Sequence, residues 1–186
     1  MNNNIRKFGT LILHGMPMPE PEKPYYKGDV IGYNGIDFEI GDTVEGKELT
    51  WLKLGNLWVC DRNILAGVSW DTLNAKGYVF GKEITIDGHR FKLRCLTGSD
   101  GSRGSFGEGC DNEWDQFMDE YNEDNSLAHF EDMYTICQET DCDYSDSRSI
   151  RGYNSARYYD GSDATYTDTY IAFRPALEIL NPDLEN

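Results

Sequence analysis

Short segments rich in apolar and aromatic residues recur along the first half of the chain and predict β-strands. Gly, Asn and Asp separate them, as is typical of strands joined by tight turns. The four segments span residues 29–33, 37–40, 49–54 and 57–61. A hairpin gives the clearest local pattern, because Asp87-Gly88 between two apolar runs favours a two-residue type I′ turn. Its register places on one face the side chains of Ile84, Ile86, Phe91 and Leu93.

Capping residues and helical spacing predict helices near the middle of the chain. Ser69 is placed to cap a short helix that runs through Ala75, and Gly77 follows where helices often end in a left-handed residue. Asn112 is placed to cap a second helix. Its apolar side chains recur at i, i+3, i+4 and i+7, which predicts one buried stripe of Trp114, Phe117, Met118 and Tyr121.

A third helix is predicted from Ser126 to about Gln138. Its apolar side chains fall on one side of a helix; they are Leu127, Phe130, Tyr134 and Cys137. The helical pattern ends after Asp141, and the apolar segment 170–179 predicts a final strand that returns to the sheet. These elements predict a single α+β domain with a small twisted antiparallel sheet, two or three helices and long loops.

The N-terminal residues are interpreted as an arm and a spacer, residues 1–24, ahead of the main domain, residues 25–186. Four prolines lie within residues 16–24, and proline at alternate positions favours an extended, semi-rigid conformation. The apolar run 9–13 is able to add a strand to a sheet. That sheet belongs either to the same chain or to a second copy, and the second case would make a homo-oligomer through the arm.

Length and charge limit the function classes. At 186 residues the chain is long enough for a sizeable core, and its net charge of −16 argues against a nucleic-acid partner. The apolar run from Phe8 to Leu13 is too short for a signal-peptide core or a membrane span, so we expect no signal peptide and no membrane insertion.

The five cysteines, an odd number, predict reduced thiols, some of them buried, and no disulfide framework.

The segment from Tyr144 to Phe173 has the composition of a binding surface. Its thirty residues hold six of the twelve tyrosines, five serines and four aspartates, with no Lys, Glu or Leu. Tyr gives a large, fairly rigid contact area with a polar tip, while Ser, Asn and Asp add adaptable hydrogen bonds. The plainer alternative is an irregular surface segment, because exposed tyrosines are common. The predicted ligand-binding residues are Tyr144, Tyr153, Asn154, Ser155, Tyr158, Tyr159, Asp160, Ser162, Asp163, Tyr166, Asp168 and Tyr170.

Three signatures, read in order, resemble the formylglycine-generating-enzyme (sulfatase-modifying) type of the C-type-lectin-like fold. Leu93-Arg94-Cys95-Leu96-Thr97, followed by Asn112-Glu113-Trp114-Asp115, is similar to that family's RLPTEAEWE, where a strand ends and a Trp-bearing helix begins. Ile150-Arg151-Gly152-Tyr153 with Arg157 resembles its RGGS and the Arg that follows, and Ala172-Phe173-Arg174 stands where the family has GFR. The resemblance implies a C-type-lectin-like fold and covers about the last half of the chain.

The chain departs from the enzymes of that family. Residues 98–111 are an insertion between the strand and the helix, and Tyr153 and Ala172 replace two glycines of the motifs. The copper-binding cysteines of those enzymes follow RGG, whereas here the four residues 153–156 include none, and a soft metal site would lack its thiolates. The resemblance therefore implies the fold without the reaction, and we expect no enzymatic activity. A degenerate enzyme of this group is one alternative.

The end of the chain resembles a second group with the same fold. Phe173-Arg174-Pro175-Ala176-Leu177 is similar to the ending of the variable proteins of diversity-generating retroelements and of related bacteriophage and prophage proteins. Their variable positions, just upstream, are rich in Tyr, Ser, Asn and Asp. The resemblance implies ligand display in a phage virion, as in a receptor-binding or tail-accessory protein, with a protein or carbohydrate ligand on a bacterial cell surface. A phage-encoded inhibitor that binds a host or defence protein in the bacterial cytoplasm is the other alternative.

Patterns for catalysis and metal binding are weak. The three histidines have no paired zinc spacing, and Cys137 and Cys142 are five residues apart, unlike a zinc or redox pair. The acidic stretch 141–146 is superficially like a calcium loop, but Ser145 stands at the third ligand position, so an irregular calcium site is left open. The Gly-rich residues 98–107 lack the Gly-Lys-Ser/Thr ending of a phosphate-binding loop. We predict no catalytic residue, no metal and no cofactor.

Three arginines of the motifs are predicted to be structural. A buried guanidinium needs hydrogen-bonded partners, so Arg151, Arg157 and Arg174 are expected to pair with buried acids such as Glu113 or Asp115.

Overall fold

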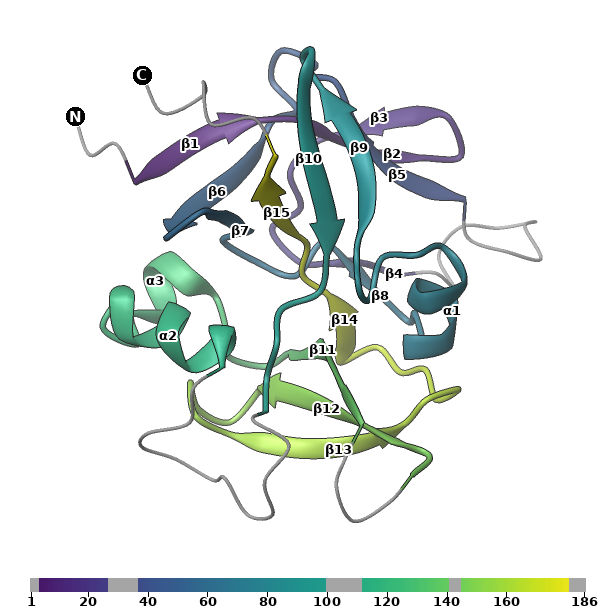
Figure 1. Cartoon of the computed structure of the whole chain (residues 1–186), viewed down its shortest axis with the longest axis vertical. Helices are drawn as coiled ribbons and strands as arrows, with labels where there is room; N and C mark the ends of the chain where they lie inside the picture. Colours follow the sequence, from purple (N-terminus) through teal and green to yellow (C-terminus); the bar gives the residue numbers. More distant parts are fainter. Residues whose placement is uncertain (1–3, 27–36, 100–111, 141–144, 181–186) are drawn as a thin grey trace.

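The computed structural model describes residues 4–26, 37–99, 112–140 and 145–180 (Figure 1). Within these residues the protein is α+β, with three short helices and sheets whose strand pairs are mostly antiparallel. The predicted α+β class is therefore confirmed. The strand predicted at residues 29–33 lies outside the described residues.

The first sheet has six strands, all paired antiparallel with their neighbours. Its spatial order is β1 (Ile5–Phe8), β6 (Leu49–Leu54), β7 (Leu57–Cys60), β15 (Ala176–Ile179), β10 (His89–Arg94) and β9 (Lys82–Ile86). The strand predictions at 49–54 and 57–61 are confirmed here. β15, the last strand along the chain, lies in the middle of this sheet.

The second sheet also has six strands and includes two parallel pairs, β11 with β14 and β4 with β8. Its order is β13 (Tyr159–Asp163), β12 (Ser147–Gly152), β11 (Tyr134–Thr140), β14 (Ile171–Phe173), β8 (Leu65–Ala66) and β4 (Tyr25–Tyr26). In Figure 1, β12 and β13 lie at one end of the molecule, far from the turn of the β9–β10 hairpin. The Tyr-rich segment of the sequence thus lies at this end.

The N-terminal segment pairs within its own chain. β1 joins the first sheet, and β2 (Thr10–Leu13) is the central strand of a third sheet between β3 (Met16–Met18) and β5 (Phe38–Gly41). The apolar arm therefore adds strands to the sheets of the same chain, and residues 16–18, predicted as part of a spacer, form a strand paired with β2. The boundary at residue 24 stays a prediction.

Local signals explain the hairpin and the two well-capped helices. Asp87 and Gly88 have φ of 51° and 79°, as a type I′ turn requires, and the predicted hairpin register is confirmed. The Ser69 side chain accepts a hydrogen bond from the Thr72 N–H at the start of α1 (Trp70–Ala75). The Asn112 side chain caps α2 (Glu113–Glu120) in the same way, and the predicted stripe on α2 is buried.

The third predicted helix is wrong over most of its length. α3 spans only Asn125–Ala128, and His129 ends it in a left-handed conformation with φ of 37°. Residues 134–140 form β11, which pairs with β12 and β14. Aromatic and β-branched residues at 134–136 favour a strand, and burial on both faces removes the alternation that would have distinguished a strand from a helix.

The last apolar segment forms two strands in place of the one predicted. β14 belongs to the second sheet and β15 to the first, with Arg174 and Pro175 between them. Pro175 lacks an N–H, and its carbonyl oxygen accepts a hydrogen bond from the Cys60 N–H at 3.0 Å. This short crossing ties the two large sheets together.

Two clusters of buried apolar side chains form the core. The larger lies between the three sheets and includes Leu11, Trp51 and Phe173, and the smaller lies beneath α2 and includes Trp114 and Phe117. The cysteines in the described part, Cys60, Cys95 and Cys137, are free and buried, as predicted, and burial raises the pKa of each thiol. No helix of the described residues has the length and apolar character needed to span a bilayer.

Candidate functional site

The three sequence signatures come together in one buried group, which we call the arginine frame: Trp114, Asp115, Arg151 and Arg174. Trp114 is fully buried and donates its indole N–H to the Ala156 carbonyl oxygen at 2.7 Å. The Arg174 guanidinium lies 5.4 Å from the centre of the Trp114 ring. Arg151 forms an ion pair with Asp115. Segments about sixty residues apart in sequence thus share one set of contacts.

The predicted acid partners are confirmed for two of the three arginines. Arg151 and Arg157 both contact the Asp115 carboxylate, the latter at 3.3 Å. The prediction for Arg174 is wrong: among the described residues its hydrogen-bond partners are main-chain carbonyl oxygens, those of Ala128 at 2.6 Å, His129 at 2.8 Å and Asp61 at 3.3 Å. Complete burial lowers the pKa of Arg174 to about 10.

Glu113, the other acid predicted to pair with Arg151, Arg157 or Arg174, is instead bound by Arg94. Its guanidinium forms two hydrogen bonds to the Glu113 carboxylate, at 2.6 and 2.7 Å. This pairing, despite the desolvation of the carboxyl group, holds the pKa of Glu113 below its ordinary value. Sequence reasoning missed Arg94, although it stands in the first signature, as the last residue of β10.

The strands β12 and β13 position the tyrosine-rich segment. Directly opposite residues in an antiparallel pair share a face, and Ile150 lies opposite Asp160 while Arg151 lies opposite Tyr159. Asp160 therefore points to one side of the sheet and Tyr159 to the other. Tyr159 covers the Arg151 side, where the guanidinium lies 5.9 Å from its ring centre.

Four tyrosines gather on the Asp160 side of the sheet: Tyr134, Tyr153, Tyr166 and Tyr170. We call these four residues, together with Asp160, the tyrosine face. The Tyr134 and Tyr153 rings stack at 4.7 Å between centroids with 8° between their planes. Tyr170 lies 5.9 Å from Tyr153 and 6.1 Å from Tyr134. These centroid separations are those of favourable aromatic pairs, so the rings support one another.

Carboxylates hold the phenol groups of the tyrosine face. Tyr134 donates its hydroxyl to Asp160 at 3.1 Å, and Tyr166 donates to Asp168 at 2.8 Å. The Tyr166 and Tyr170 hydroxyl oxygens are 3.4 Å apart. Burial, followed by the charge of Asp160, raises the pKa of Tyr134, so this hydroxyl keeps its proton at neutral pH.

The tyrosine face borders an open hollow of about 470 Å³. Four tyrosines, two carboxylates and a serine line it, and the lining includes no Lys, Arg or His; the lining residues are Tyr134, Ile150, Tyr153, Asp160, Gly161, Ser162, Asp163, Tyr166, Tyr170 and Ile171. Its volume falls in the range of sites for small ligands or single side chains. Aromatic rings beside carboxylates offer both cation–π contacts and ionic hydrogen bonds.

The main chain is unusual where it enters the tyrosine face. Gly152 has φ of 92°, and a Cβ there would lie 2.9 Å from the Phe130 carbonyl oxygen, so only glycine fits. Tyr153, which stands where the resembling motif has its second glycine, has φ of 77°. Its N–H donates to the Phe130 carbonyl oxygen at 2.8 Å, and its own carbonyl oxygen accepts from Asp132 N–H at 3.0 Å. A strained tyrosine fixed by such contacts is typical of functional sites.

The structure brings together many, but not all, of the predicted ligand-binding residues. None of those in the described part is buried. Those that line the hollow are Tyr153, Asp160, Ser162, Asp163, Tyr166 and Tyr170. Tyr158, whose ring is 6.1 Å from Tyr134, and Asp168 lie beside it, Asn154 and Ser155 are exposed without lining it, and Tyr159 lies on the other side of the sheet. Tyr144 lies outside the described residues.

Among the four tyrosines of the tyrosine face, Tyr134 is the one that was not predicted from the sequence. It is buried, stacks on Tyr153 and lines the hollow, but the incorrect helix gave no indication that it would lie beside the Tyr-rich segment. The aromatic and β-branched run Tyr134-Thr135-Ile136 was the available signal for a strand. A correct strand assignment would have placed Tyr134 and Ile136 on one face and Thr135 on the other.

Among the residues that the structure describes, no group of three or more His, Cys, Asp or Glu side chains is placed to hold a metal ion. Most of the acidic stretch considered for calcium, residues 141–144, lies outside the described residues, as do residues 100–107 of the Gly-rich segment.

Comparisons of the chain with protein-family models, with curated proteins and with solved structures found no match.

Proposed function

We propose that the protein is a non-enzymatic ligand-recognition protein with a C-type-lectin-like fold, encoded by a phage or prophage and acting as a receptor-binding or tail-accessory protein. The tyrosine face is its contact surface. The observation that carries the proposal is the grouping of four tyrosines and two carboxylates around one open hollow. Side chains of this kind recognise ligands through broad contact and adaptable hydrogen bonds.

The arginine frame supports the C-type-lectin-like part of the proposal. The resemblance rests on three motifs in order, and residues from all three contact one another around Trp114. Motifs that matched by chance would have no reason to meet in space. The frame also includes Arg151 of β12, and the ion pair of Arg151 with Asp115 ties to α2 the strand that leads into Tyr153 of the tyrosine face.

The charge of the hollow favours a ligand with a positively charged group. Asp160 and Asp163 line it without a basic residue, and the whole chain carries a net charge of −16. A Lys or Arg side chain of a protein ligand satisfies the carboxylates and lies over the tyrosine rings at the same time. We therefore favour a protein ligand with an exposed basic residue over a neutral carbohydrate.

Adsorption of fluorescently labelled protein to a panel of bacterial cells tests the proposal. Tyr166 is 45% exposed on the tyrosine face, and Phe80 is 58% exposed elsewhere, so Tyr166→Ala and Phe80→Ala are matched variants that each remove one exposed ring. We expect Tyr166→Ala to reduce adsorption at least about tenfold, as hot-spot tyrosines do, and Phe80→Ala to leave it unchanged.

Three outcomes contradict the proposal in different ways. If no cell type adsorbs the protein but a host protein co-purifies with it and is lost in Tyr166→Ala, the recognition surface stands and the virion role fails. If Tyr166→Ala and Phe80→Ala behave alike in every binding assay, the tyrosine face is not the contact surface. Added copper with oxygen-dependent turnover of a thiol peptide would instead indicate an enzyme.

A further inference from the structure

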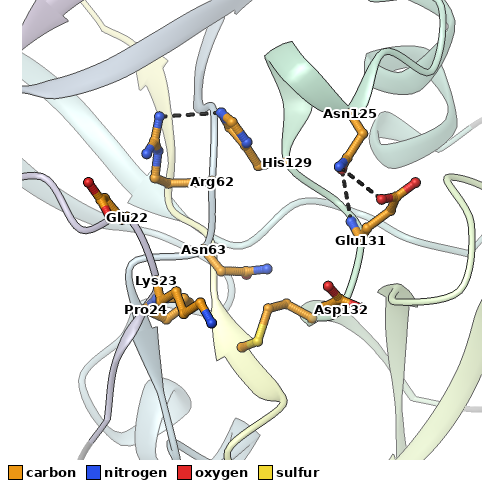
Figure 2. A pocket seen from close by; sticks show the side chains of 10 residues that line it. Glu22, Lys23, Pro24, Arg62, Asn63, Asn125, His129, Glu131 and Asp132 are labelled. Carbon is orange, nitrogen blue, oxygen red and sulfur yellow. Dashed lines mark hydrogen bonds between the residues drawn. The ribbon is translucent and has the colours of Figure 1, made fainter.

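A second hollow, of about 350 Å³, opens beside α3 and shares no lining residue with the hollow of the tyrosine face (Figure 2). Residues 22–24, 62–63 and 131–133 surround it together with Asn125 and His129. Three separate segments of the chain, 22–24, 62–63 and 125–133, therefore contribute to it. Whether a ligand binds in this second hollow does not depend on the function proposed above.

Asn63 is a buried amide with an unused donor in this hollow. Its side chain lines the hollow, the residue is only 2% exposed, and its Oδ1 accepts a hydrogen bond from the Thr135 hydroxyl at 3.1 Å. Its Nδ2 has no hydrogen-bond partner within the described part of the chain. In Figure 2 this nitrogen points into the space between His129 and Asp132. A buried donor without an acceptor is unfavourable, and Asn63 Nδ2 is the one such atom, of four in the described part of the chain, whose residue lines this hollow; an acceptor atom there would remove the penalty.

The basic residues of the hollow carry little free charge. Arg62 donates to both oxygens of Asp61, at 2.8 and 2.7 Å, which compensates its guanidinium. Its Nη2 also lies 3.3 Å from His129 Nε2. A guanidinium only donates hydrogen bonds, so this contact requires an unprotonated Nε2 and a neutral imidazole with its proton on Nδ1. Burial lowers the pKa of His129, which agrees with the neutral form.

The rim of the hollow is acidic. Glu22, Glu131 and Asp132 are exposed there, and Lys23 is the basic residue among the rim side chains. Because the charge of Arg62 is compensated by Asp61, the rim leaves the hollow with a net negative potential. A ligand of this hollow would therefore place an acceptor oxygen beside Asn63 Nδ2 and a positively charged group at the acidic rim.

The main chain around the hollow is also unusual. His129 and Asp132 have φ of 37° and 63°, so two residues other than glycine are left-handed within one short segment. Asn125 fixes this segment, because its Oδ1 accepts from the N–H groups of Phe130 at 2.8 Å and Glu131 at 3.0 Å. The side chains of the hollow are thus held by a defined turn.

We infer that this hollow binds a small organic cation that carries a primary ammonium group beside a carbonyl or hydroxyl oxygen. The oxygen accepts from Asn63 Nδ2, and the ammonium group lies against Asp132 and Glu131. Two sources share this chemistry: a free amino-acid-like molecule and the N-terminus of a peptide. Both present an ammonium group one carbon away from a carbonyl.

Titration of ¹⁵N-labelled full-length protein, followed by NMR at the Asn63 side-chain amide, tests the inference. Glycinamide carries both groups, acetamide lacks the ammonium group and ethylamine lacks the oxygen. We expect glycinamide to shift the Asn63 resonance saturably and to bind at least about threefold more tightly than either partial analogue, as one exposed ionic contact allows. Triglycine and N-acetyl-triglycine form a second pair of probes.

A charge-matched pair of variants locates the ammonium group. Asp132→Asn keeps a side chain that tolerates the left-handed conformation and removes the charge, while Glu45→Gln removes one exposed acidic charge that does not line the hollow. We expect Asp132→Asn to weaken glycinamide binding about threefold and Glu45→Gln to leave it unchanged.

The peptide probes distinguish the two sources. Binding of triglycine at least as tight as that of glycinamide, with loss on acetylation, supports a peptide N-terminus, whereas binding of glycinamide alone supports a free small molecule. The inference is overturned if no probe shifts the Asn63 amide saturably, if acetamide binds as well as glycinamide, or if both variants bind alike.

Discussion

The arginine frame and the tyrosine face meet at β12, which contains Arg151 of the frame and is followed directly by Tyr153 of the face, but they satisfy their polar groups in different ways. In the frame, Arg151 and Arg174 are completely buried, and their partners are a carboxylate and main-chain carbonyl oxygens. On the face, the phenol groups bond to one another and to aspartates at the surface. A buried charge requires fixed partners, whereas surface phenols exchange partners at little cost. The face is also tied to the core, because Tyr134 is buried there, whereas Tyr166 is exposed and is the ring most available to a ligand.

The largest effect is expected from removing the frame's Arg174. Arg174→Ala leaves the carbonyl oxygens of Ala128 and His129 without donors and opens a cavity beneath Trp114. We expect the free energy of unfolding to fall by about 3 kcal/mol or more. Urea denaturation followed by Trp fluorescence measures the loss.

Arg90→Ala is the matched control for that variant. Arg90 is a surface arginine whose ion pair with Glu83 is solvent-exposed on both sides. Its removal should change stability by about 0.5 kcal/mol or less. Similar losses in the two variants would contradict the structural role assigned to the buried Arg174.

A smaller effect on stability, with a large one on binding, is expected at Tyr153. Tyr153→Gly relieves about 1–2 kcal/mol of left-handed strain, which offsets about 0.5–1.5 kcal/mol of lost stacking on Tyr134. We expect stability to change by about 1 kcal/mol or less, while adsorption to the target cell falls at least about threefold.

Tyr153→Ala separates the ring from the backbone strain. It removes the same ring but keeps a Cβ at a φ of 77°, so it should be less stable than Tyr153→Gly by about 1 kcal/mol. Thermal unfolding of the two variants gives this difference. An alanine variant as stable as the glycine variant would mean that the conformation at residue 153 carries no strain.

The smallest effect is expected from pH at His129, which links the frame to the second hollow. Burial, with Arg62 and Arg174 nearby, lowers its pKa in the folded state, while Asp61 acts in the opposite direction. As pH falls below the ordinary histidine value of about 6.5, the unfolded chain takes up the proton first, so stability decreases with falling pH. The decline between about pH 6.5 and 5 should be less steep in His129→Gln. Parallel declines would exclude His129 as the cause.

Features fixed by a few adjacent residues were predictable from the sequence. The Asp87-Gly88 turn and the caps at Ser69 and Asn112 depend on local geometry, and the structure has all three. The strand β11 was not predictable in this way. It is buried on both faces by partners from elsewhere in the chain, so its apolar spacing also fitted a helix.

The candidate site was predictable in composition but not in arrangement. The Tyr-rich segment indicated a surface of the right kind, yet which rings share a face depends on the start of β13 and on its register with β12. That register sends Tyr159 toward Arg151 and Asp160 toward Tyr134. Tyr134 itself comes from a strand outside the Tyr-rich segment and reaches the site only through long-range pairing.

The division of the last apolar segment between the two large sheets has a consequence for synthesis on the ribosome. β14 separates β11 from β8, and β15 separates β7 from β10, so each sheet has a gap until residues 171–179 have emerged. A nascent chain stopped before them would expose unpaired edges on both sides of each gap. Closure of the two sheets is therefore a late and joint event, made by the same few residues within a short time of one another.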